Sequence, residues 1–476
     1  MNKSMEKKNT SIVVLLLAGT FIAILNQTLM ITAIPPIMDE MGITANSAQW
    51  LTTVFMLVNG IMIPVSAFLL ERFTTRQLFI TAMSVFAFGT LVAGIAPNFE
   101  VLLLGRIIQS SGAGVMLPLM QTVFFMIFPV HRRGAAMGLV GLVISFAPAI
   151  GPALSGWVTE HYSWRVLFFI ILPIALIDIL IASFVLRNVT EVTKPKLDVL
   201  SVILSSFGFG GLLYGFTSAG NAGWLAISTI LTLGIGVISL ILFITRQLRL
   251  AHPMLEFRVF KHALFPQAVI IGMVTFMGLI GSETIIPLFM QNMREFTALE
   301  AGLALLPGAV ITAILSPVTG RVFDRFGARW LVITGLAIIT LASFGLSHLS
   351  PTTSFTYIMM MYSVRMFGLA MVLMPVSTAA LNRLPKKLIA HGAAMDNTMK
   401  MIAASVGTAV LVTVMTTTES TVQKSIDIPN PDIYGANMAF LALTILSLAA
   451  FILSFSIKDR KPGLSDKETQ GEKVEQ

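Results

Sequence analysis

Fourteen apolar runs, each about twenty residues long, follow one another along this chain and leave little room for a soluble domain. A helix of about 20 apolar residues is long enough to cross the hydrocarbon core of a bilayer. Membrane barrels need short strands of alternating polarity, which these continuous runs do not provide. The sequence therefore predicts an all-α polytopic membrane protein. The expected spans are roughly 11–34, 50–70, 77–96, 101–125, 134–158, 165–186, 198–217, 224–245, 264–291, 300–322, 329–349, 354–381, 391–416 and 436–457.

Composition agrees with this class and excludes several kinds of function. Hydrophobic residues make up 55% of the chain and charged residues only 11%, too few to cover a soluble surface. The chain has no cysteine, which excludes disulfides and thiolate metal sites. It contains no phosphate-binding G-x-x-x-x-G-K-[ST] stretch, no nucleophile–base pattern and no metal-spaced histidines. We therefore expect no enzyme and no ATP-driven pump, with no catalytic residues, no metal and no cofactor.

The basic residues predict how the chain is oriented. With the N-terminus in the cytoplasm, 25 of the 31 Lys and Arg residues fall in cytoplasmic segments. Such an excess is typical of the cytoplasmic side of membrane proteins, and an odd number of spans would remove it. We expect a multi-pass protein of the bacterial cytoplasmic membrane with both termini in the cytoplasm. The net charge of +8 then reflects contact with the lipid bilayer, and no nucleic-acid partner is expected.

A short charged stretch occurs twice. Residues 66–76 read S-A-F-L-L-E-R-F-T-T-R, and residues 319–329 read T-G-R-V-F-D-R-F-G-A-R. Upstream, I-P-P-I-M-D-E-M (34–41) pairs with I-P-L-F-M-Q-N-M (286–293) at nearly the same offset. Repetition at a constant spacing indicates a duplicated unit, here of six spans.

This duplication predicts the domain organisation. We expect a six-helix bundle over 1–190 and a second one over 264–457. Two spans without a counterpart lie between them and predict an inserted hairpin over 191–250. A mixed basic and apolar segment follows at 251–263, which we interpret as an interfacial linker on the cytoplasmic side. The polar residues 458–476 predict a disordered cytoplasmic tail.

Small residues and prolines in the fifth span keep a long, fixed spacing. Small side chains permit close helix packing, and proline weakens the local hydrogen-bond ladder, so this stretch predicts a hinge or a close-packed seam. An ordinary small-residue helix contact is the alternative. The residues of this predicted hinge are Gly138, Ala147, Gly151, Pro152, Ser155 and Gly156.

Together these motifs resemble the major facilitator superfamily, in its fourteen-span drug:proton antiporter branch. The resemblance implies two six-helix bundles plus an inserted helix pair, and a bacterial multidrug exporter. It further implies that the repeated loop is a conformational latch, whereas positive-inside charge alone is the simpler alternative. The implied latch residues are Glu71, Arg72, Arg76, Asp324, Arg325 and Arg329.

Two arginines interrupt apolar runs. Arg106 in the fourth span reads L-L-G-R-I-I-Q, and Arg365 is its counterpart in the second half. A charged side chain inside a span costs roughly 2.5–3.5 kcal/mol on insertion scales unless it reaches water or a polar cavity. The resemblance implies that Arg106 takes part in proton transfer; a side chain that extends to the outer interface is the alternative.

Three acids lie inside spans. Glu283 is in the ninth span, which the resemblance places beside the central cavity, and withdrawal from water favours its protonated form. We therefore predict Glu283 as the carboxylate that couples proton to substrate, with a rim acid as the alternative. Asp178 is a second candidate for proton coupling, although a polar contact to the inserted pair is the simpler interpretation. Asp396 and Lys400 predict an i, i+4 ion pair.

The resemblance also suggests residues that line the cavity. Asn26 occupies a position where the family usually has aspartate, so it cannot titrate, but it can still hydrogen-bond to substrate. Flexible methionines suit varied apolar ligands, although most methionines in such helices are packing residues. The predicted cavity residues are Asn26, Gln27, Met30, Gln109, Met116, Met120, Glu283, Met290, Arg365 and Met374.

These features predict a monomeric exporter that exchanges protons for lipophilic small molecules by alternating access, with the proton gradient as its energy source. Two alternatives remain open: a flippase for lipids or lipid-linked substrates on the same fold, and a non-transporting membrane sensor or scaffold.

Overall fold

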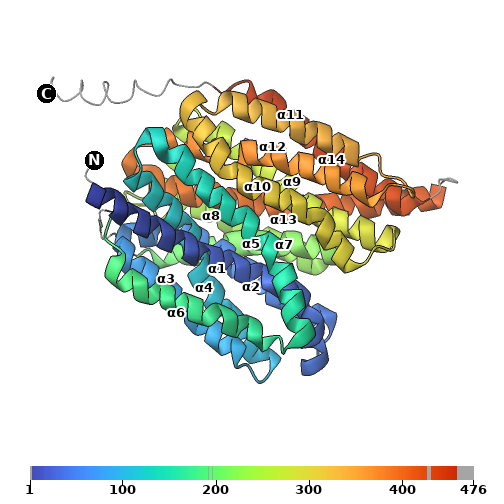
Figure 1. Ribbon diagram of the computed structural model, residues 1–476, viewed down its shortest axis with the longest axis horizontal. Coiled ribbons are helices and arrows are strands. Elements are labelled where there is room, and N and C mark those ends of the chain that lie inside the picture. Colours follow the sequence, from blue (N-terminus) through green and yellow to red (C-terminus); the bar gives the residue numbers. More distant parts are fainter. Residues whose placement is uncertain (1–2, 191, 194, 196, 426–429, 458–476) are drawn as a thin grey trace.

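The computed structural model describes residues 3–457, except 191, 194, 196 and 426–429, and these residues form fourteen α-helices and no strand (Figure 1). All fourteen helices are long and apolar enough to cross a membrane, which confirms the predicted number of spans. The helices are α1 Lys3–Met41, α2 Ala45–Arg72, α3 Thr75–Gly94, α4 Phe99–Ile127, α5 Arg133–His161, α6 Arg165–Val185, α7 Val199–Ala222, α8 Ile227–Arg249, α9 Phe265–Leu288, α10 Ala298–Phe326, α11 Arg329–Leu346, α12 Phe355–Asn382, α13 Ile389–Ser425 and α14 Pro431–Ser454.

Helices α1–α6 form a first bundle and α9–α14 a second one, as predicted. In Figure 1 the outermost helices are α3 and α6 on one side and α11 and α14 on the other. Helix α1 begins and α14 ends on the same side of the molecule, called the terminal face below; the opposite side is the far face. The predicted tail 458–476 lies outside the described residues.

The two copies of the repeated loop make their turns differently. In the second copy α10 ends at Gly327, whose φ of +86° lies in the left-handed region that glycine adopts without strain. In the first copy Thr74 replaces that glycine and has an ordinary φ of −67°. Its side chain accepts the N–H of Gln77, and the Gln77 side chain accepts the N–H of Thr74, a capping box that starts α3. The first copy of the loop, which lacks the glycine, therefore makes its turn with a capping box instead.

The bundles meet most closely where α5 crosses α10. A Cβ atom on Gly138 would lie only 2.4 Å from the carbonyl oxygen of Ser316, and one on Gly320 only 2.2 Å from that of Gly134. Contacts this short with backbone atoms mean that only glycine fits at these positions. The first glycine of the predicted hinge therefore lies in the seam between the bundles.

The remaining residues of the predicted hinge lie elsewhere along α5. A Cβ on Gly151 would lie 2.1 Å from the hydroxyl oxygen of Thr28, so this glycine permits close packing on α1 within the first bundle. Ala147 and Ser155 are buried, and the Pro152 carbonyl accepts a hydrogen bond from Thr32 at 3.4 Å. Gly156 faces open space. Part of the motif thus serves the seam, and part serves the first bundle.

The inserted hairpin lies across one side of the seam. Helix α7 packs on α2 of the first bundle and on α13 of the second, while α8 packs on α7. Trp224 in the turn between them donates to the Thr413 hydroxyl of α13 at 2.7 Å. At the other end Arg246 binds both carboxylate oxygens of Asp198, at 2.7 and 3.0 Å, which lowers the pKa of Asp198 to about 2. The hairpin is therefore fixed at both ends.

The linker between hairpin and second bundle is packed against protein. Met254, Leu255 and Val259 are buried, and a short 3-10 helix covers Phe257–Lys261. The Gln247 side chain of α8 accepts the backbone N–H groups of Met254 and Leu255 at 2.7 and 3.3 Å. The linker therefore joins the hairpin to the second bundle through fixed contacts.

The seam predicts the effect of adding a single methyl group. Gly138→Ala places a Cβ against the backbone of α10, so it destabilises this packing by about 1–3 kcal/mol, the usual cost of overpacking. We expect a lower melting temperature of the detergent-solubilised protein. Gly156→Ala, in the same motif, is the matched control and leaves the melting temperature unchanged because its Cβ meets nothing within 4 Å. Equal melting curves for both variants would contradict the assignment of the seam.

Candidate functional site

Glu283 lies on α9, an inner helix that packs on α12, α13 and α14. Its side chain is partly exposed although apolar residues surround it along the helix. The carboxylate is within hydrogen-bonding reach of the Tyr362 hydroxyl and close to the Arg365 guanidinium, both from α12. Less than two turns later the helix widens into a π-helix at Phe289–Met293. Such bulges are frequent at functional sites.

Arg365 is almost completely buried beside this carboxylate. Its Nε donates to the Ser343 hydroxyl of α11 at 3.2 Å, and its Nη1 donates to the Ser282 hydroxyl of α9 at 2.8 Å. A Cβ on Gly278 would lie 2.5 Å from the guanidinium, so the absence of a side chain there makes room for it. These contacts hold Arg365 in place through uncharged groups, independently of the Glu283 carboxylate.

Arg106 is its counterpart in the first bundle and is completely buried. Its Nη1 donates to the side-chain oxygens of Asn26 at 2.6 Å and Gln109 at 2.7 Å, and its Nε donates to the Leu51 carbonyl at 3.2 Å. The guanidinium also lies 4.2 Å from the centre of the Phe55 ring. Arg106 therefore does not extend to the outer interface, which excludes that alternative for this conformation.

The two arginine clusters differ in their compensating charge. Arg106 is held by amide and carbonyl oxygens, and its buried Nη2 has no hydrogen-bond partner. Arg365 has the Glu283 carboxylate nearby. A carboxylate next to a guanidinium can change its protonation and alter the local charge, whereas the amide of Asn26 cannot. The second bundle therefore carries the titratable member of the pair.

The predicted cavity methionines are packing residues in this conformation. Each is nearly or completely buried in the hydrophobic core, whereas Gln27 on α1 is partly exposed. These methionines are Met30, Met116, Met120, Met290 and Met374. Two shallow apolar grooves, lined by residues of α10–α12, contain none of the predicted site residues. A substrate cavity thus remains a prediction.

Asp178 does not make the contact that we predicted for it. Its carboxylate lies against Gly19 of α1, where a Cβ would come within 2.8 Å of Oδ2, and not against the inserted pair. The reason is that α6 packs on α3 and α1, on the side of the first bundle away from the hairpin. The side chain is buried and its Oδ2 has no hydrogen-bond partner. Its predicted role in proton coupling stays open.

On the terminal face, an acid from each repeated loop crosses to the other bundle. Asp324, in the last turn of α10, accepts the N–H groups of Gly134 at 2.7 Å and Ala135 at 2.8 Å. These are the first residues of α5, where unpaired N–H groups and the helix dipole favour a negative charge. The carboxylate thus joins the second bundle to the start of a helix of the first.

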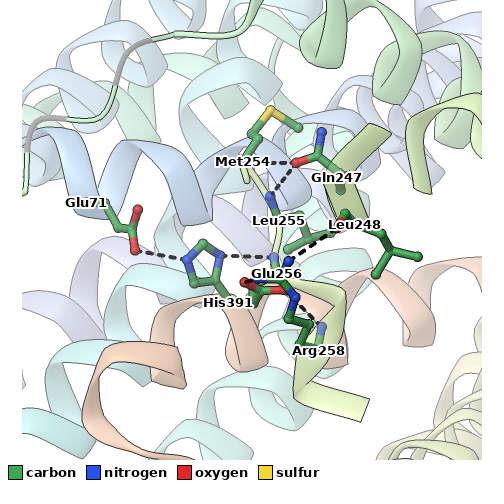
Figure 2. Close-up of polar contacts among 8 residues, drawn as sticks. All are labelled: Glu71, Gln247, Leu248, Met254, Leu255, Glu256, Arg258 and His391. Atoms are coloured by element: carbon green, nitrogen blue, oxygen red, sulfur yellow. Dashed lines mark hydrogen bonds and ion pairs between the residues drawn. The ribbon is translucent and has the colours of Figure 1, made fainter. Parts of the chain in front are cut away.

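Glu71, at the end of α2 in the first bundle, contacts the second bundle, as Figure 2 shows. Its Oε1 lies 2.9 Å from Nε2 of His391, a buried residue in the first turn of α13. The other ring nitrogen, Nδ1, accepts the backbone N–H of Glu256 in the linker at 3.3 Å. Because Nδ1 accepts, Nε2 carries the proton and donates to Glu71. One histidine therefore connects the first bundle, the linker and the second bundle.

For the predicted latch arginines, the contacts described here do not join the two bundles. Arg72 donates to the Pro195 carbonyl at 3.3 Å, and Arg76 donates to the carbonyl of Ser183. Arg325 lies 5.2 Å from the centre of the neighbouring Phe326 ring, and Arg329 begins α11. Of the six predicted latch residues, the two acids are the ones whose described contacts cross the seam.

Sequence patterns missed two further contacts across the seam. Arg133 donates to the Asn382 side chain of α12 at 2.9 Å, and Asn397 of α13 donates to Gln121 of α4 at 2.7 Å. No motif marks these residues, and only the packing of the bundles brings them together. All these cross-bundle contacts lie in the half of the molecule near the terminal face, so this conformation is closed there.

Among the described residues, no three His, Asp or Glu side chains gather as metal ligands would.

The Asp324 contact predicts a measurable opening. Asp324→Asn removes the charge at the start of α5 and one of its two acceptors, which weakens closure by about 1–2 kcal/mol, or about five- to thirtyfold in the open population. Because the chain has no cysteine, Ser316→Cys in the seam reports opening through its rate of alkylation. We expect faster alkylation in the Asp324→Asn background. Arg325→Gln is the control, with no change; equal rates for both would refute the latch.

Comparison with known proteins agrees with this architecture. Residues 16–408 match the model of the Major Facilitator Superfamily. The chain is 54% identical to the uncharacterized MFS-type transporter YcnB of Bacillus subtilis, over 96% of this chain and 98% of that protein. It is 41% identical to the lincomycin resistance protein LmrB of Bacillus subtilis, over 96% and 97%.

A solved structure shares the fold at low sequence identity. The human organic anion transporter MFSD10 superposes with a TM-score of 0.68 at 14% identity, covering 94% of this chain and 99% of that one. With its fourteen spans, its two bundles and these relatives, the chain belongs to the major facilitator superfamily as a transporter, similar to the fourteen-span members that confer drug resistance.

Proposed function

We propose that this protein exports lipophilic small molecules across the bacterial cytoplasmic membrane in exchange for protons, by alternating access. The observation that carries this proposal is Glu283: a partly exposed carboxylate on an inner helix, beside Tyr362 and Arg365. A charged carboxylate in an apolar interior is costly unless it is paired or protonated. Proton and substrate can therefore compete for the same group.

The exchange follows from charge balance around Glu283. When the carboxylate is ionised, its charge is balanced by Arg365 or by a basic group of the substrate. When a proton binds, the carboxylate becomes neutral, and its attraction for a cationic or zwitterionic substrate is lost. Arg365 keeps its hydrogen bonds to Ser282 and Ser343 in both states. Protonation thus favours substrate release.

The seam supplies the second requirement, a site that opens to one side at a time. The contacts of Asp324 and Glu71 close the terminal face, which the distribution of basic residues indicates as the cytoplasmic side. Glu283 lies in the half of α9 nearer the far face, so in this conformation protons would reach it from outside. Rocking of the bundles would expose it to the cytoplasm. Differential affinity of proton and substrate for the two states supplies the coupling.

The relatives support the substrate class. LmrB is named for resistance to lincomycin, and this chain aligns with nearly all of it. An ionised Glu283 would attract a basic group on such a substrate. Buried methionines on α1, α4 and α12 are flexible side chains that suit apolar ligands of different shape once the bundles move. We therefore propose lipophilic amines as the first substrates to test.

Replacing the carboxylate tests the proposal directly. In proteoliposomes that contain purified protein, addition of lincomycin or ethidium should drive protons across the membrane. Glu283→Gln keeps the shape but removes the titratable group, so we expect this proton movement to fall to the level of protein-free liposomes. Glu283→Asp should retain part of it, and Glu300→Gln, an acid in the first turn of α10, serves as the control with full activity. Undiminished coupling in Glu283→Gln would exclude Glu283 from the mechanism. Transport of lipids without any pH gradient would instead favour a flippase.

A further inference from the structure

A second carboxylate lies inside the second bundle, paired with a lysine. Asp396 Oδ2 and Lys400 Nζ, one turn apart on α13, are 2.7 Å from each other. Only 1% of the Asp396 side chain and 5% of the Lys400 side chain are exposed. Lys400 also donates to the Ser377 hydroxyl of α12. The other carboxylate oxygen, Oδ1 of Asp396, is buried without a hydrogen-bond partner.

Stability alone does not explain this pair. Withdrawing two charges from water costs several kcal/mol per ion, and well-packed apolar residues are often as stable or more so. The unpartnered oxygen adds to that cost. The neighbouring α9 makes room for the pair with Gly272, where a Cβ would lie 3.1 Å from Lys400 Cε and 3.8 Å from Asp396 Oδ1. A half-satisfied buried carboxylate is suited to binding a proton.

The pair lies next to a contact that must break when the bundles move. Asn397, the next residue, donates to the Gln121 side chain of α4 in the first bundle at 2.7 Å, and both side chains are buried. Opening of the terminal face separates α4 from α13 and breaks this bond. In the closed state the pair is sealed.

Helix α9 relates this pair to Glu283. Gly272, which faces Lys400, and Glu283 are eleven positions apart on α9. Eleven residues complete just over three helical turns, so both lie on one face of α9, about 16 Å apart along its axis. Glu283 is in the half nearer the far face, and Asp396 is in the half nearer the terminal face. The Glu283 carboxylate thus projects from one face of α9, and the Asp396 carboxylate lies against the same face nearer the terminal face.

We propose that Asp396, with Lys400, is a second proton site, which receives the proton that Glu283 releases and passes it to water at the terminal face. This inference rests on the proposed proton exchange. While the bundles move and the pair is no longer sealed, water carries the proton from the Glu283 carboxyl to Oδ1 of Asp396, which becomes a carboxylic acid. Lys400 remains an ammonium group held by Ser377. When the seam opens, the acid gives its proton to water, and the ion pair forms again.

Asp396 and Lys400 are the ionisable groups among the contacts of this pair. Helix α9 contributes Gly272 and α12 contributes Ser377, neither of which is ionisable, and the adjacent Asn397 binds the uncharged Gln121 of α4. On its own helix the charged neighbour is Lys400. His391, five positions earlier, is engaged with Glu71 and the linker.

The test uses a double variant, because removing one charge leaves the other buried and unpaired. Asp396→Asn/Lys400→Met removes both charges and keeps similar volumes, so we expect a folded protein with a nearly unchanged melting temperature. Two measurements follow. Ethidium exchange between the two sides of a liposome, without a pH gradient, should continue. Uphill ethidium transport driven by a pH gradient should fall to the level of protein-free liposomes.

A measurement without substrate separates this inference from the proposed function. In detergent, acidification should produce, beside the C=O bands of Asp178 and of the surface acids, a further infrared C=O band of a protonated carboxylic acid that Glu283→Gln retains and the double variant loses. Loss of that band together with lost uphill transport supports the second proton site. Full uphill transport in the double variant, or a band that persists in it, overturns the second site and leaves the role of Glu283 intact. Full uphill transport in Glu283→Gln contradicts the proposed function itself.

Discussion

Charge withdrawn from water is the constraint on which the rest of this structure depends. Each helix satisfies its own backbone groups, so the apolar interior tolerates fourteen spans but few ionisable side chains. Most of those that remain have partners: Arg106 lies among amide and carbonyl oxygens, Arg365 lies close to Glu283, and Lys400 pairs with Asp396, whereas Oδ2 of the buried Asp178 has no hydrogen-bond partner. When Glu283 or Asp396 gains or loses a proton, the free energy of its contact with the neighbouring basic side chain therefore changes.

The same constraint explains the division of work between the bundles. Both contain a buried arginine at corresponding positions of the repeat, but only the second places a carboxylate beside it. In the first bundle Arg106 is bound by the amide oxygen of Asn26, which cannot titrate. The buried acid of the first bundle, Asp178, lies on α6 against Gly19, whereas the second bundle has an acid close to its buried arginine. At the terminal face, the carboxylates of the latch acids Asp324 and Glu71 each bind a group of the opposite bundle and hold the two bundles together.

Much of the fold was readable from the sequence, because hydrophobic length and the repeat depend on local patterns. The number of spans, the two bundles and the inserted pair are confirmed. Helix ends were less accurate: α1 continues to Met41, beyond the predicted end at residue 34, because the helix runs on through Pro35 and Pro36, where the sequence suggested a break. The sequence also indicated the Asp396–Lys400 ion pair, since an i, i+4 spacing brings the two together within one helix.

Contacts between distant helices were not readable in the same way. Asp178 was assigned to the wrong neighbour, because the sequence does not show which side of the bundle α6 occupies. No sequence pattern marked His391, yet it joins the first bundle, the linker and the second bundle (Figure 2).

The proposed exchange depends on Glu283, and proton release on substrate binding tests this role most directly. When ethidium is added to the purified wild-type protein in unbuffered detergent solution, the account predicts a fall in pH that saturates with binding. Saturable binding of ethidium with no change in pH would contradict it.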